Sequence, residues 1–434
     1  MTIEQFYAHF FTNPVLCTDT RNITPGCIFF ALKGGNFNGN LFAQDALNKG
    51  AAYAVVDEAA VVQGEQFLLV DDVLKALQDL AAYHRKKLGE SGLRVVALTG
   101  SNGKTTTKEL MARVLARKYK TLATEGNLNN HIGVPLTLLK LKAEHEIAVI
   151  EMGANHQKEI EMLCEIAQPE FGLVTNIGLA HLEGFGGPEG VFKGKTEMFR
   201  HLIAHEGFAF LLEDEPRVHA FKNQIPHLTY GLYSSADICG ELIPGHQFVH
   251  YKWKNIDGKT FEVHTQMIGS YNLPNMLAAT ASGIKLGVAP EEINRAISEY
   301  VPANNRSQIE KRGSNTLILD CYNANPSSMI AAIENIAVTP AKNKMLILGD
   351  MFELGDSSAS EHQRIVDFIA EKTPAAKVIL VGKNFSATTD KHSFLRMNDS
   401  EEVKNCLAQN APAESLILIK GSRGMKMEIS AESL

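Results

Sequence analysis

A short stretch at residues 96–107, VALTGSNGKTTT, constrains the fold of this 434-residue chain more than any other. An apolar run enters a turn that contains Gly100 and Gly103, and a lysine with three threonines follows. The next apolar residues recur at helical spacing, at Leu110, Met111, Val114 and Leu115. A buried strand that leads through a glycine turn into a helix N-terminus favours an anion, because backbone N–H groups and the helix dipole point into the turn.

The turn differs from the usual phosphate loop in its length. Two residues separate its glycines, whereas the common motif has four. Lys104 would reach the terminal phosphates of a nucleotide, and the Thr105 hydroxyl would be a magnesium ligand. The alternative is an ordinary turn with a solvated lysine, and the strand and helix on either side make it the weaker reading. Physical reasoning from these residues does not explain the shortened spacing.

Length and composition limit the functional classes. A chain of 434 residues is too long for one core and fits two or three domains. A formal net charge of −7 gives no reason to expect nucleic acid or an anionic membrane as a partner. No run of 18 apolar residues and no basic leader with an apolar stretch occurs, so no membrane span or secretory signal is predicted. The cysteines are far apart and suggest reduced thiols in a cytoplasmic protein, at Cys17, Cys27, Cys164, Cys239, Cys321 and Cys406.

Short apolar runs that end in glycine or a polar residue predict parallel strands. Three lie mid-chain, RVVALTG, IAVIEMG and FGLVTNIG, and four lie toward the C-terminus, TLILD, MLILGD, KVILVG and LILIKG. Two separate α/β sheets are the simplest account, with a smaller α/β unit before them. Interruptions at 84–92 and 300–306 give domains 1–83, 84–302 and 303–434. Residues 206–268 look hairpin-like, with a tight turn at Asp257-Gly258.

Ligands of open parallel sheets bind at the carboxyl ends of the strands. The polar residues at these ends are Thr99, Glu151, Asn176, Asp320, Asp350 and Lys420. Mg²⁺ prefers oxygen ligands, so Glu151 suits it well and the nearby His181 less so. For His181 taken alone, a hydrogen-bonded loop histidine is the better reading.

A set of strings occurs in order along the chain: GSNGKTT, EMG at 151–153, AHLE at 180–183, KTE at 195–197, YNLPN at 271–275 and YNANP at 322–326. This order resembles the Mur ligases, ATP-dependent amide-forming enzymes of peptidoglycan precursor synthesis, whose phosphate loop has the short GxxGK[ST] spacing. The resemblance covers nearly the full chain. It implies an α/β fold of three domains: a small N-terminal α/β domain for a UDP-sugar substrate, a central P-loop ATPase-like domain with a parallel sheet, and a Rossmann-like C-terminal ligase domain that binds a dipeptide and closes over ATP.

Further segments narrow the resemblance within the family. They are TDTRNITPGCIFFALKGGNFNGNLF, TEGNLNNHIGVPLTLL, GLAHLEGFGGPEGV, DCYNANPSSM, LGDMFELG and KGSRGMKME. They are similar to the members that join D-alanyl-D-alanine to UDP-N-acetylmuramoyl-tripeptide. The resemblance therefore implies a cytoplasmic enzyme, monomeric by default, that acts in cell wall biogenesis and so in cell shape, cell division and the cell cycle.

The resemblance also assigns roles in ATP binding. Phosphates would lie on the loop formed by Gly100, Ser101, Asn102, Gly103, Lys104, Thr105 and Thr106. Asn272 and Asn275 match an NxxN pair whose amides can meet adenine. Arg306 and Asp320 match positions of the C-terminal domain that meet the phosphates and ribose after closure around 301–306.

Metal and catalytic roles are implied in the same way. Thr105 matches a ligand of the magnesium that accompanies the ATP phosphates, and Glu151 and His181 match the ligands of a second magnesium ion. Lys195 matches a lysine that reacts with CO₂ to become a carbamate, an anion able to orient magnesium, and its alternative is an ordinary exposed lysine on a helix. Lys104, Lys195 and His181 are thus the expected catalytic residues, with ATP and Mg²⁺ as cofactors.

The substrate positions are Asp19 and Arg21 for the uridine diphosphate, Asn129 and Asn130 for the muramoyl peptide, and Asn323 and Asn325 in YNANP. For the last two, the alternative is asparagine that forms a turn before Pro326. The chain departs from the family at Asn38-Gly39-Asn40, where Asp-Gly-His is frequent, at Tyr271, where histidine is frequent, and at Leu319, where an acidic residue is common. The first departure puts details of the N-terminal substrate contacts in doubt.

Other functions remain open at this stage. A sister ligase that adds one amino acid and a folylpolyglutamate synthase-like enzyme are the nearest, and the absence of a DNPR-like segment in the C-terminal domain disfavours both. A P-loop switch or motor would hydrolyse ATP without any UDP-sugar peptide. A UDP-sugar-binding module would not need Lys104, Glu151 and Lys195 together.

Overall fold

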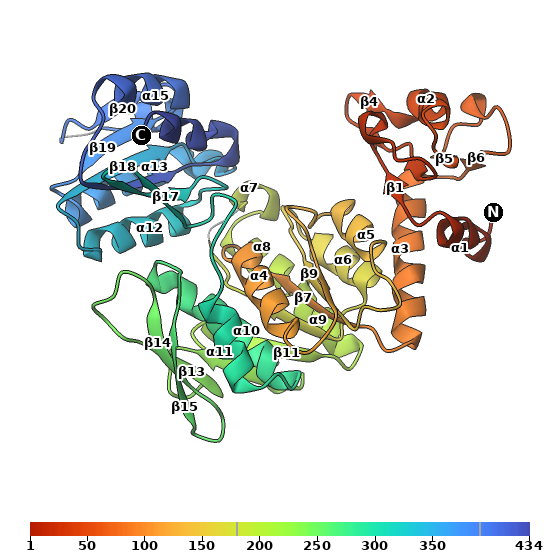
Figure 1. Ribbon diagram of the computed structural model, residues 1–434, viewed down its shortest axis with the longest axis horizontal. Coiled ribbons are helices and arrows are strands. Elements are labelled where there is room, and N and C mark those ends of the chain that lie inside the picture. Colours follow the sequence, from red (N-terminus) through yellow and green to blue (C-terminus); the bar gives the residue numbers. More distant parts are fainter. Residues whose placement is uncertain (179–180, 390–391) are drawn as a thin grey trace.

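The computed structural model describes residues 1–178, 181–389 and 392–434. Figure 1 shows three α/β bodies, with the N-terminal one joined to the middle one through a long helix and the C-terminal one on the other side of the middle one. The three-domain α/β fold predicted from the sequence is confirmed.

The N-terminal domain holds a parallel sheet of four strands in the order β1-β2-β5-β6. Strand β2 is buried along its whole length. Its residues Ile28 and Phe30 face one hydrophobic core, and Phe29 faces another. The strands are β1 (Leu16–Cys17), β2 (Ile28–Phe30), β5 (Tyr53–Val56) and β6 (Phe67–Leu69), beside a β3 (Lys33–Gly34) and β4 (Phe37–Asn38) hairpin. The helices are α1 (Ile3–Thr12), α2 (Ala43–Asn48) and α3 (Val73–Glu90), with short 3-10 helices η1 (Thr20–Asn22), η2 (Gly39–Phe42) and η3 (Ala59–Val61).

Helix α3 connects this domain to the next. Asp72 caps its N-terminus by accepting a hydrogen bond from the Lys75 amide at 2.8 Å. The boundary predicted after residue 83 falls inside this helix. Arg85, which is 4 % exposed, donates to the carbonyls of Ala167 at 3.0 Å and Gln168 at 2.8 Å and pairs with Glu170. The second half of α3 therefore belongs physically to the central domain.

The central domain is built on a nine-stranded sheet, in the order β15-β14-β13-β12-β11-β10-β7-β9-β8. Its strands are β7 (Arg94–Thr99), β8 (Thr121–Ala123), β9 (Ile147–Glu151), β10 (Phe171–Val174), β11 (Phe208–Leu212), β12 (His227–Gly231), β13 (Ile238–Leu242), β14 (His250–Lys254) and β15 (Thr260–His264). Pairing is parallel from β8 across to β13, and β14 and β15 are antiparallel. The predicted hairpin is confirmed, and a five-residue connection that contains Gly258 closes it.

Helices cover both faces of this sheet. Val95 and Ala97 of β7 face one core, and Val96 and Leu98 face the other, as the alternation of strand side chains requires. One core includes α5 (Gly133–Leu138), α6 (Glu159–Ala167) and α9 (Glu197–Ala204), and the other α4 (Lys104–Leu115), α10 (Leu273–Lys285) and α11 (Pro290–Ser298). Shorter helices are α7 (Leu182–Phe185), α8 (Pro188–Lys195), η4 (Pro216–Phe221) and η5 (Ser270–Asn272).

The C-terminal domain has six strands in the order β16-β17-β21-β18-β19-β20, parallel except for β16. They are β16 (Gln308–Arg312), β17 (Asn315–Asp320), β18 (Asn343–Gly349), β19 (Lys377–Val381), β20 (Leu395–Met397) and β21 (Ser415–Lys420). The helices are α12 (Pro326–Val338), α13 (Ser358–Lys372), α14 (Lys383–Ser386) and α15 (Ser400–Gln409), with η6 (Gly355–Ser357), η7 (Arg423–Met425) and η8 (Met427–Ser433). Two hydrophobic cores again flank the sheet. Among the described residues, no helix is long and apolar enough to cross a membrane.

The contacts of Arg85 predict that two lysine or arginine substitutions in the same helix, α3, change the stability of the protein by different amounts. Arg85→Met keeps the apolar stem but leaves two carbonyls and Glu170 without their donor. We therefore expect the free energy of unfolding of the central domain to fall by about 2–3 kcal/mol. Lys87→Met is the matched control because Lys87 pairs with Glu90 on the exposed side of the same helix, where an ion pair contributes about 0–1 kcal/mol. Urea unfolding followed by circular dichroism measures both changes, and equal midpoints would contradict this account of α3.

Candidate active site

The phosphate loop joins β7 to α4, as predicted. Its backbone is fastened to the segment after β10. The Asn102 amide donates to Asn176 Oδ1 at 3.0 Å, and the Asn102 carbonyl accepts from Thr175 Oγ1 at 2.6 Å and from Asn176 Nδ2 at 3.0 Å. Ser101 Oγ exchanges hydrogen bonds of 3.0 Å with the backbone of Gly178. The loop is therefore preorganised before any ligand binds.

Both glycines of the loop are required by its geometry. Gly100 and Gly103 have φ values of +145° and +77°, in the region that favours glycine. A Cβ at Gly100 would lie 2.0 Å from Thr175 Oγ1, and one at Gly103 would lie 2.5 Å from Asn275 Oδ1. The short spacing thus matches a loop that is packed against two other segments.

Lys104 begins α4 and folds back over the loop. Its Nζ donates to the carbonyls of Gly100 at 2.8 Å and Ser101 at 3.3 Å. Burial lowers the pKa of Lys104, and the nearby Glu151 carboxylate opposes that shift. An anion on the loop would add a second charge partner for this ammonium group.

Asn272 and Asn275 form the wall behind the loop. Asn275 Oδ1 accepts from Thr107 Oγ1 at 3.1 Å, and its Nδ2 donates to Asn272 Oδ1 at 3.0 Å. Asn272 Nδ2 in turn donates to the Ile268 carbonyl at 2.8 Å. The predicted pair lies in the site, and its amides connect α4 to the start of α10.

Glu151 ends β9 beside the phosphate loop and is 1 % exposed. Its Oε1 accepts from Asn129 Nδ2 at 2.8 Å, while Oε2 has no hydrogen-bond partner among the residues that the structure describes. A buried carboxylate oxygen without a partner is costly. The arrangement fits a hard cation such as Mg²⁺, which takes oxygen ligands.

Lys195 lies at the end of α8 and is 1 % exposed. Its Nζ donates to the Ala154 carbonyl at 3.1 Å and lies 4.9 Å from the centre of the Phe185 ring. Burial lowers the pKa of Lys195 well below its usual range, and the charge of Lys104 lowers it further. The alternative of an exposed lysine is therefore wrong, although Lys195 does not line the main cavity.

His181 connects the central domain to the C-terminal domain. Its Nδ1 lies 2.5 Å from Glu353 Oε2, and this contact lowers the pKa of Glu353. Ala180, the first residue of the AHLE string, lies outside the described residues. His181 thus stands at a domain border as well as at the edge of the cavity.

The C-terminal domain supplies the opposite wall of the site. Asp320 and Lys420 end the neighbouring strands β17 and β21, and Lys420 Nζ lies 2.5 Å from Asp320 Oδ2. The Arg306 guanidinium stacks 3.5 Å above the Tyr322 ring centre. Asn325, which caps α12, donates from Nδ2 to Asn102 Oδ1 at 2.7 Å. One side chain therefore joins the C-terminal domain to the phosphate loop.

These groups surround one cavity of about 680 Å³. Sixteen of the predicted site residues line it: Ser101, Asn102, Gly103, Lys104, Thr105, Thr106, Asn129, Asn130, Glu151, His181, Asn272, Asn275, Arg306, Asp320, Asn323 and Asn325. Gly100 lies behind the loop, where it packs on Thr175. The expectation that ligands bind at the carboxyl ends of parallel strands therefore pointed to residues that are far apart in sequence and close together in the fold.

Asp19 and Arg21 lie in the N-terminal domain, outside this cavity. Asp19 accepts from the Arg21 amide at 2.9 Å and pairs with its guanidinium at 2.6 Å. Hydrogen bonds from Arg21 lower the pKa of Asp19 to about 2. Nearby, Asn40 of the divergent Asn-Gly-Asn segment is buried and donates to Asp57 Oδ1 at 2.7 Å, so it has a structural role in this chain.

Sequence reasoning missed several residues of the cavity. Asn176 and Lys420 stood at predicted strand ends but received no role, although both line the cavity. Tyr271 was noted only as a departure, yet its hydroxyl hydrogen-bonds to Ser307 Oγ at 2.9 Å, and burial raises its pKa. Asp350, also at a strand end, instead accepts from the amides of Asn384 and Phe385, both at 2.9 Å, and caps α14.

Comparison with known proteins agrees with this geometry. The sequence matches three family descriptions: Mur ligase family, catalytic domain, over residues 15–85; Mur ligase middle domain, over 98–283; and Mur ligase, glutamate ligase domain, over 305–423. It is 35% identical over 426 residues to the UDP-N-acetylmuramoyl-tripeptide–D-alanyl-D-alanine ligase of Bacillus subtilis, covering 95% of this chain and 91% of that protein.

This chain belongs to the Mur ligase family.

Further relatives place it beside one branch of that family. The ligase of the same name from Escherichia coli is 36% identical, with 96% of this chain and 92% of that protein covered. A crystal structure of MurF from Acinetobacter baumannii superposes with a TM-score of 0.86 at 34% identity, over 96% of this chain and 92% of that one. MurF from Thermotoga maritima in complex with ADP gives 0.87 at 26% identity, over 97% of each chain.

The tight packing at Gly103 yields a test of the loop. Gly103→Ala places a methyl group on the Asn275 amide, so we expect nucleotide affinity to fall by about tenfold or more. Gly26→Ala is the matched control, since Gly26 has a similar φ of +83° but open space around its Cβ position. Both variants carry a backbone cost of about 1–2 kcal/mol. Titration with a fluorescent ADP analogue measures binding, and undiminished affinity in Gly103→Ala would refute the assigned packing.

Proposed function

We infer that this chain is an ATP-dependent ligase that adds D-alanyl-D-alanine to UDP-N-acetylmuramoyl-tripeptide and so completes the pentapeptide precursor of peptidoglycan. One observation carries this inference. The phosphate loop, Glu151 with its unpartnered Oε2, and the strand ends of the C-terminal domain line a single cavity among the described residues. The likeness to ligases of that name over nearly the full chain supplies the substrates.

The chemistry requires a nucleotide with a good leaving group. A carboxylate does not react with an amine at neutral pH, because hydroxide is a poor leaving group. In the proposed reaction, the terminal carboxylate of the tripeptide attacks the γ-phosphorus of ATP, which gives an acyl phosphate and ADP. The amine of D-alanyl-D-alanine then attacks the acyl carbon, the tetrahedral intermediate collapses, and inorganic phosphate leaves.

The phosphate loop supports the first step by charge and position. The amides of residues 103–106 lie at the N-terminus of α4, a position at which backbone N–H groups favour an anion. Lys104 contributes a positive charge that its carbonyl contacts hold over the loop. Because these groups are already in place, stabilising the charge of the transferred phosphoryl group costs little reorganisation.

Thr105 at the loop would hold one magnesium ion with the phosphates. Glu151, through its Oε2, and His181 at the domain border would hold a second, which Lys195 would help to orient as its carbamate. When bound, Mg²⁺ neutralises phosphate charge. Glu151 fits this role best, because Asn129 fixes one carboxylate oxygen and leaves the other available. The Asn129 contact supports a peptide site beside the phosphates, because it joins one of the proposed peptide-binding asparagines to Glu151.

The rest of the nucleotide would occupy the remaining walls of the cavity. Adenine would lie by Asn272 and Asn275, and Arg306 and Asp320 would meet phosphates and ribose from the C-terminal side. Asn323 and Asn325 would approach the dipeptide, while Asn129 and Asn130 approach the muramoyl peptide. Asp19 and Arg21 remain the proposed contacts for the uridine diphosphate at the N-terminal domain.

Closure of the C-terminal domain would exclude water from the acyl phosphate. The segment between α11 and β16 supports a hinge at 301–306, since Asn304 and Asn305 both have positive φ values, of 58° and 55°. The use of cytosolic ATP and a nucleotide-linked substrate favours a cytoplasmic location. The monomeric state stays a prediction.

The function is tested by phosphate release from ATP with each UDP-muramoyl tripeptide, with and without D-alanyl-D-alanine, and by the mass of the product. A ligase of this kind releases phosphate at a high rate only when acceptor and dipeptide are both present. Steady ATP hydrolysis without the UDP-linked peptide would instead indicate a switch or motor. Incorporation of a single amino acid would indicate a sister ligase.

Lys104→Ala should lower the rate of ligation by at least about 100-fold, because it removes a preorganised charge from the phosphoryl group. Lys118→Ala is the control, since Lys118 comes after the same helix and also donates to a backbone carbonyl, that of Gly287 at 2.8 Å. Circular dichroism of both variants checks the fold. Normal turnover by a folded Lys104→Ala protein would refute the phosphate assignment.

The environment of Lys195 supports the proposed carbamate. Only the neutral amine attacks CO₂, and burial, which holds the pKa of Lys195 well below its usual range, raises the share of that form. We expect wild-type protein in ¹³C-bicarbonate to give a carbamate resonance that Lys195→Gln lacks, and ligation by this variant to fall by roughly two orders of magnitude. The control is Lys193→Gln, which changes an exposed lysine of the same helix. A wild-type protein without the resonance, or an active Lys195→Gln variant, would rule out the carbamate.

A further inference from the structure

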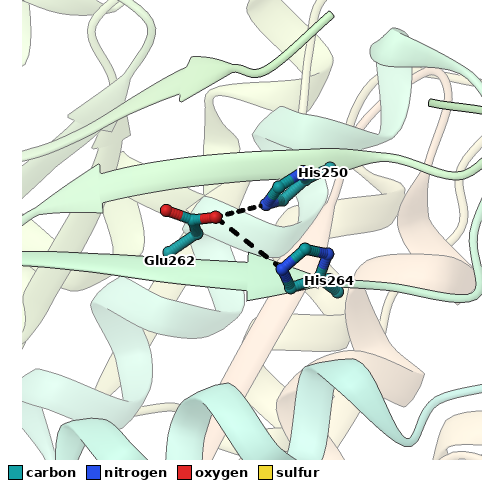
Figure 2. Close-up of side chains that lie close together, drawn as sticks. All are labelled: His250, Glu262 and His264. Carbon is teal, nitrogen blue, oxygen red and sulfur yellow. Dashed lines mark hydrogen bonds and ion pairs between the residues drawn. The ribbon is translucent and has the colours of Figure 1, made fainter. Parts of the chain in front are cut away.

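A second group of ligand-type side chains lies on the antiparallel edge of the central sheet. Figure 2 shows His250 of β14 with Glu262 and His264 of β15, all directed toward one another. His250 pairs across the strands with His264, and Lys252 pairs with Glu262. Since side chains two residues apart share a face of a strand, the three residues stand together on one face of the hairpin. None of them lines the cavity described above.

The nitrogen and oxygen atoms of this His-Glu-His cluster converge. His250 Nε2 donates to Glu262 Oε1 at 2.8 Å, and His264 Nε2 lies 3.7 Å from the same oxygen. One ligand atom from each residue lies within 4.8 Å of the other two. A zinc ion with bonds of about 2.0–2.2 Å places its ligand atoms about 3.3–3.5 Å apart, so small side-chain rotations would bring the three onto one ion.

The residues of the cluster differ in burial: His250 is buried, whereas Glu262 and His264 are exposed to solvent. His250 is 7 % exposed, and its Nδ1 has no hydrogen-bond partner in the described part of the chain. Its ring stacks on His264 with centroids 3.6 Å apart and meets His246 edge-on at 4.5 Å. Glu262 and His264 are exposed. Two imidazoles held this closely repel each other when both are protonated, whereas a shared cation would be bound by both.

We propose that His250, Glu262 and His264 bind a divalent transition metal ion of the Zn²⁺ class. Two imidazoles and one carboxylate are the donor set that zinc, nickel and copper ions accept, whereas Mg²⁺ prefers oxygen ligands alone. The exposed side of the cluster leaves room for water as the remaining ligand. The site is therefore separate in place and in metal class from the one proposed at Glu151.

A metal here would fasten the edge of the sheet. Strand β15 is the edge strand at one end of the sheet, and the bound ion would add a link between β14 and β15. Just beyond His264, Thr265 Oγ1 donates to the Val249 carbonyl at 2.8 Å, and the chain then runs to Asn272 at the nucleotide wall. The ion would thus brace the start of the segment that connects the hairpin to the active site.

Binding is tested with Zn²⁺ alone as the probe, on full-length chain stripped of metal and held in excess Mg²⁺ so that oxygen sites are occupied. Competition with a chromophoric chelator gives affinity and stoichiometry, and Co²⁺ absorption reports the coordination. We expect His264→Gln and Glu262→Gln each to weaken one site by about tenfold or more. Both residues are exposed, so these variants retain the fold.

His205→Gln is the matched control, since His205 is an exposed histidine of another stacked pair, with His201 at 4.1 Å between ring centroids. In the described part of the chain, no carboxylate completes a metal-binding group with this pair. It should bind Zn²⁺ as the wild type does. Added Zn²⁺ should raise the melting temperature of wild-type protein and of His205→Gln more than that of His264→Gln. The same affinity and stoichiometry in wild type and His264→Gln would overturn the proposal.

Discussion

The backbone of Asn102 is the point at which the site is assembled. Its amide and carbonyl are both engaged by Thr175 and Asn176 after β10, and its side chain accepts a hydrogen bond from Asn325 of the C-terminal domain. The loop has two residues between its glycines, so it can lie close along this segment without a bulge. The short spacing is therefore part of how three segments meet.

Two features of the sequence predicted much of the active-site arrangement: the alternation of residues along strands, and the polar residues at the carboxyl ends of the predicted strands. Alternate residues of β7 do enter different cores, and the parallel strands do bring Glu151 and Asp320 to the same cavity. Whether a strand-end polar group faces a ligand could not be predicted, because this depends on the path of the backbone after the strand. Both carboxylate oxygens of Asp350 accept hydrogen bonds from the amides that begin α14, whereas one carboxylate oxygen of Glu151 has no hydrogen-bond partner among the described residues. In the sequence, both residues are carboxylates at the end of an apolar run, so the pattern alone does not distinguish them.

Other contacts depend on segments that only the tertiary fold brings together. Lys195 lies in an ordinary helical pattern, and its burial comes from packing near Ala154 and Phe185. The His-Glu-His cluster was also not predicted, because 12 residues separate His250 from Glu262 and their approach depends on the hairpin register. The predicted turn at Gly258 located the hairpin, but a shift of one residue in register would have turned Glu262 and His264 to the opposite face.

The border between the central and C-terminal domains is made of polar contacts. It includes Asn325 with Asn102 at 2.7 Å and His181 with Glu353 at 2.5 Å. The hydrogen bond contributes about 1 kcal/mol and the half-exposed ion pair about 0–1 kcal/mol, and polar borders of this kind permit domains to move. Because Asn102, His181 and Asn325 also line the cavity, a bound nucleotide would contact both sides of the border at once and would add to its stability. On the proposed function, part of the binding energy of ATP would hold Arg306 and Asp320 against the phosphate loop while the acyl phosphate needs protection from water.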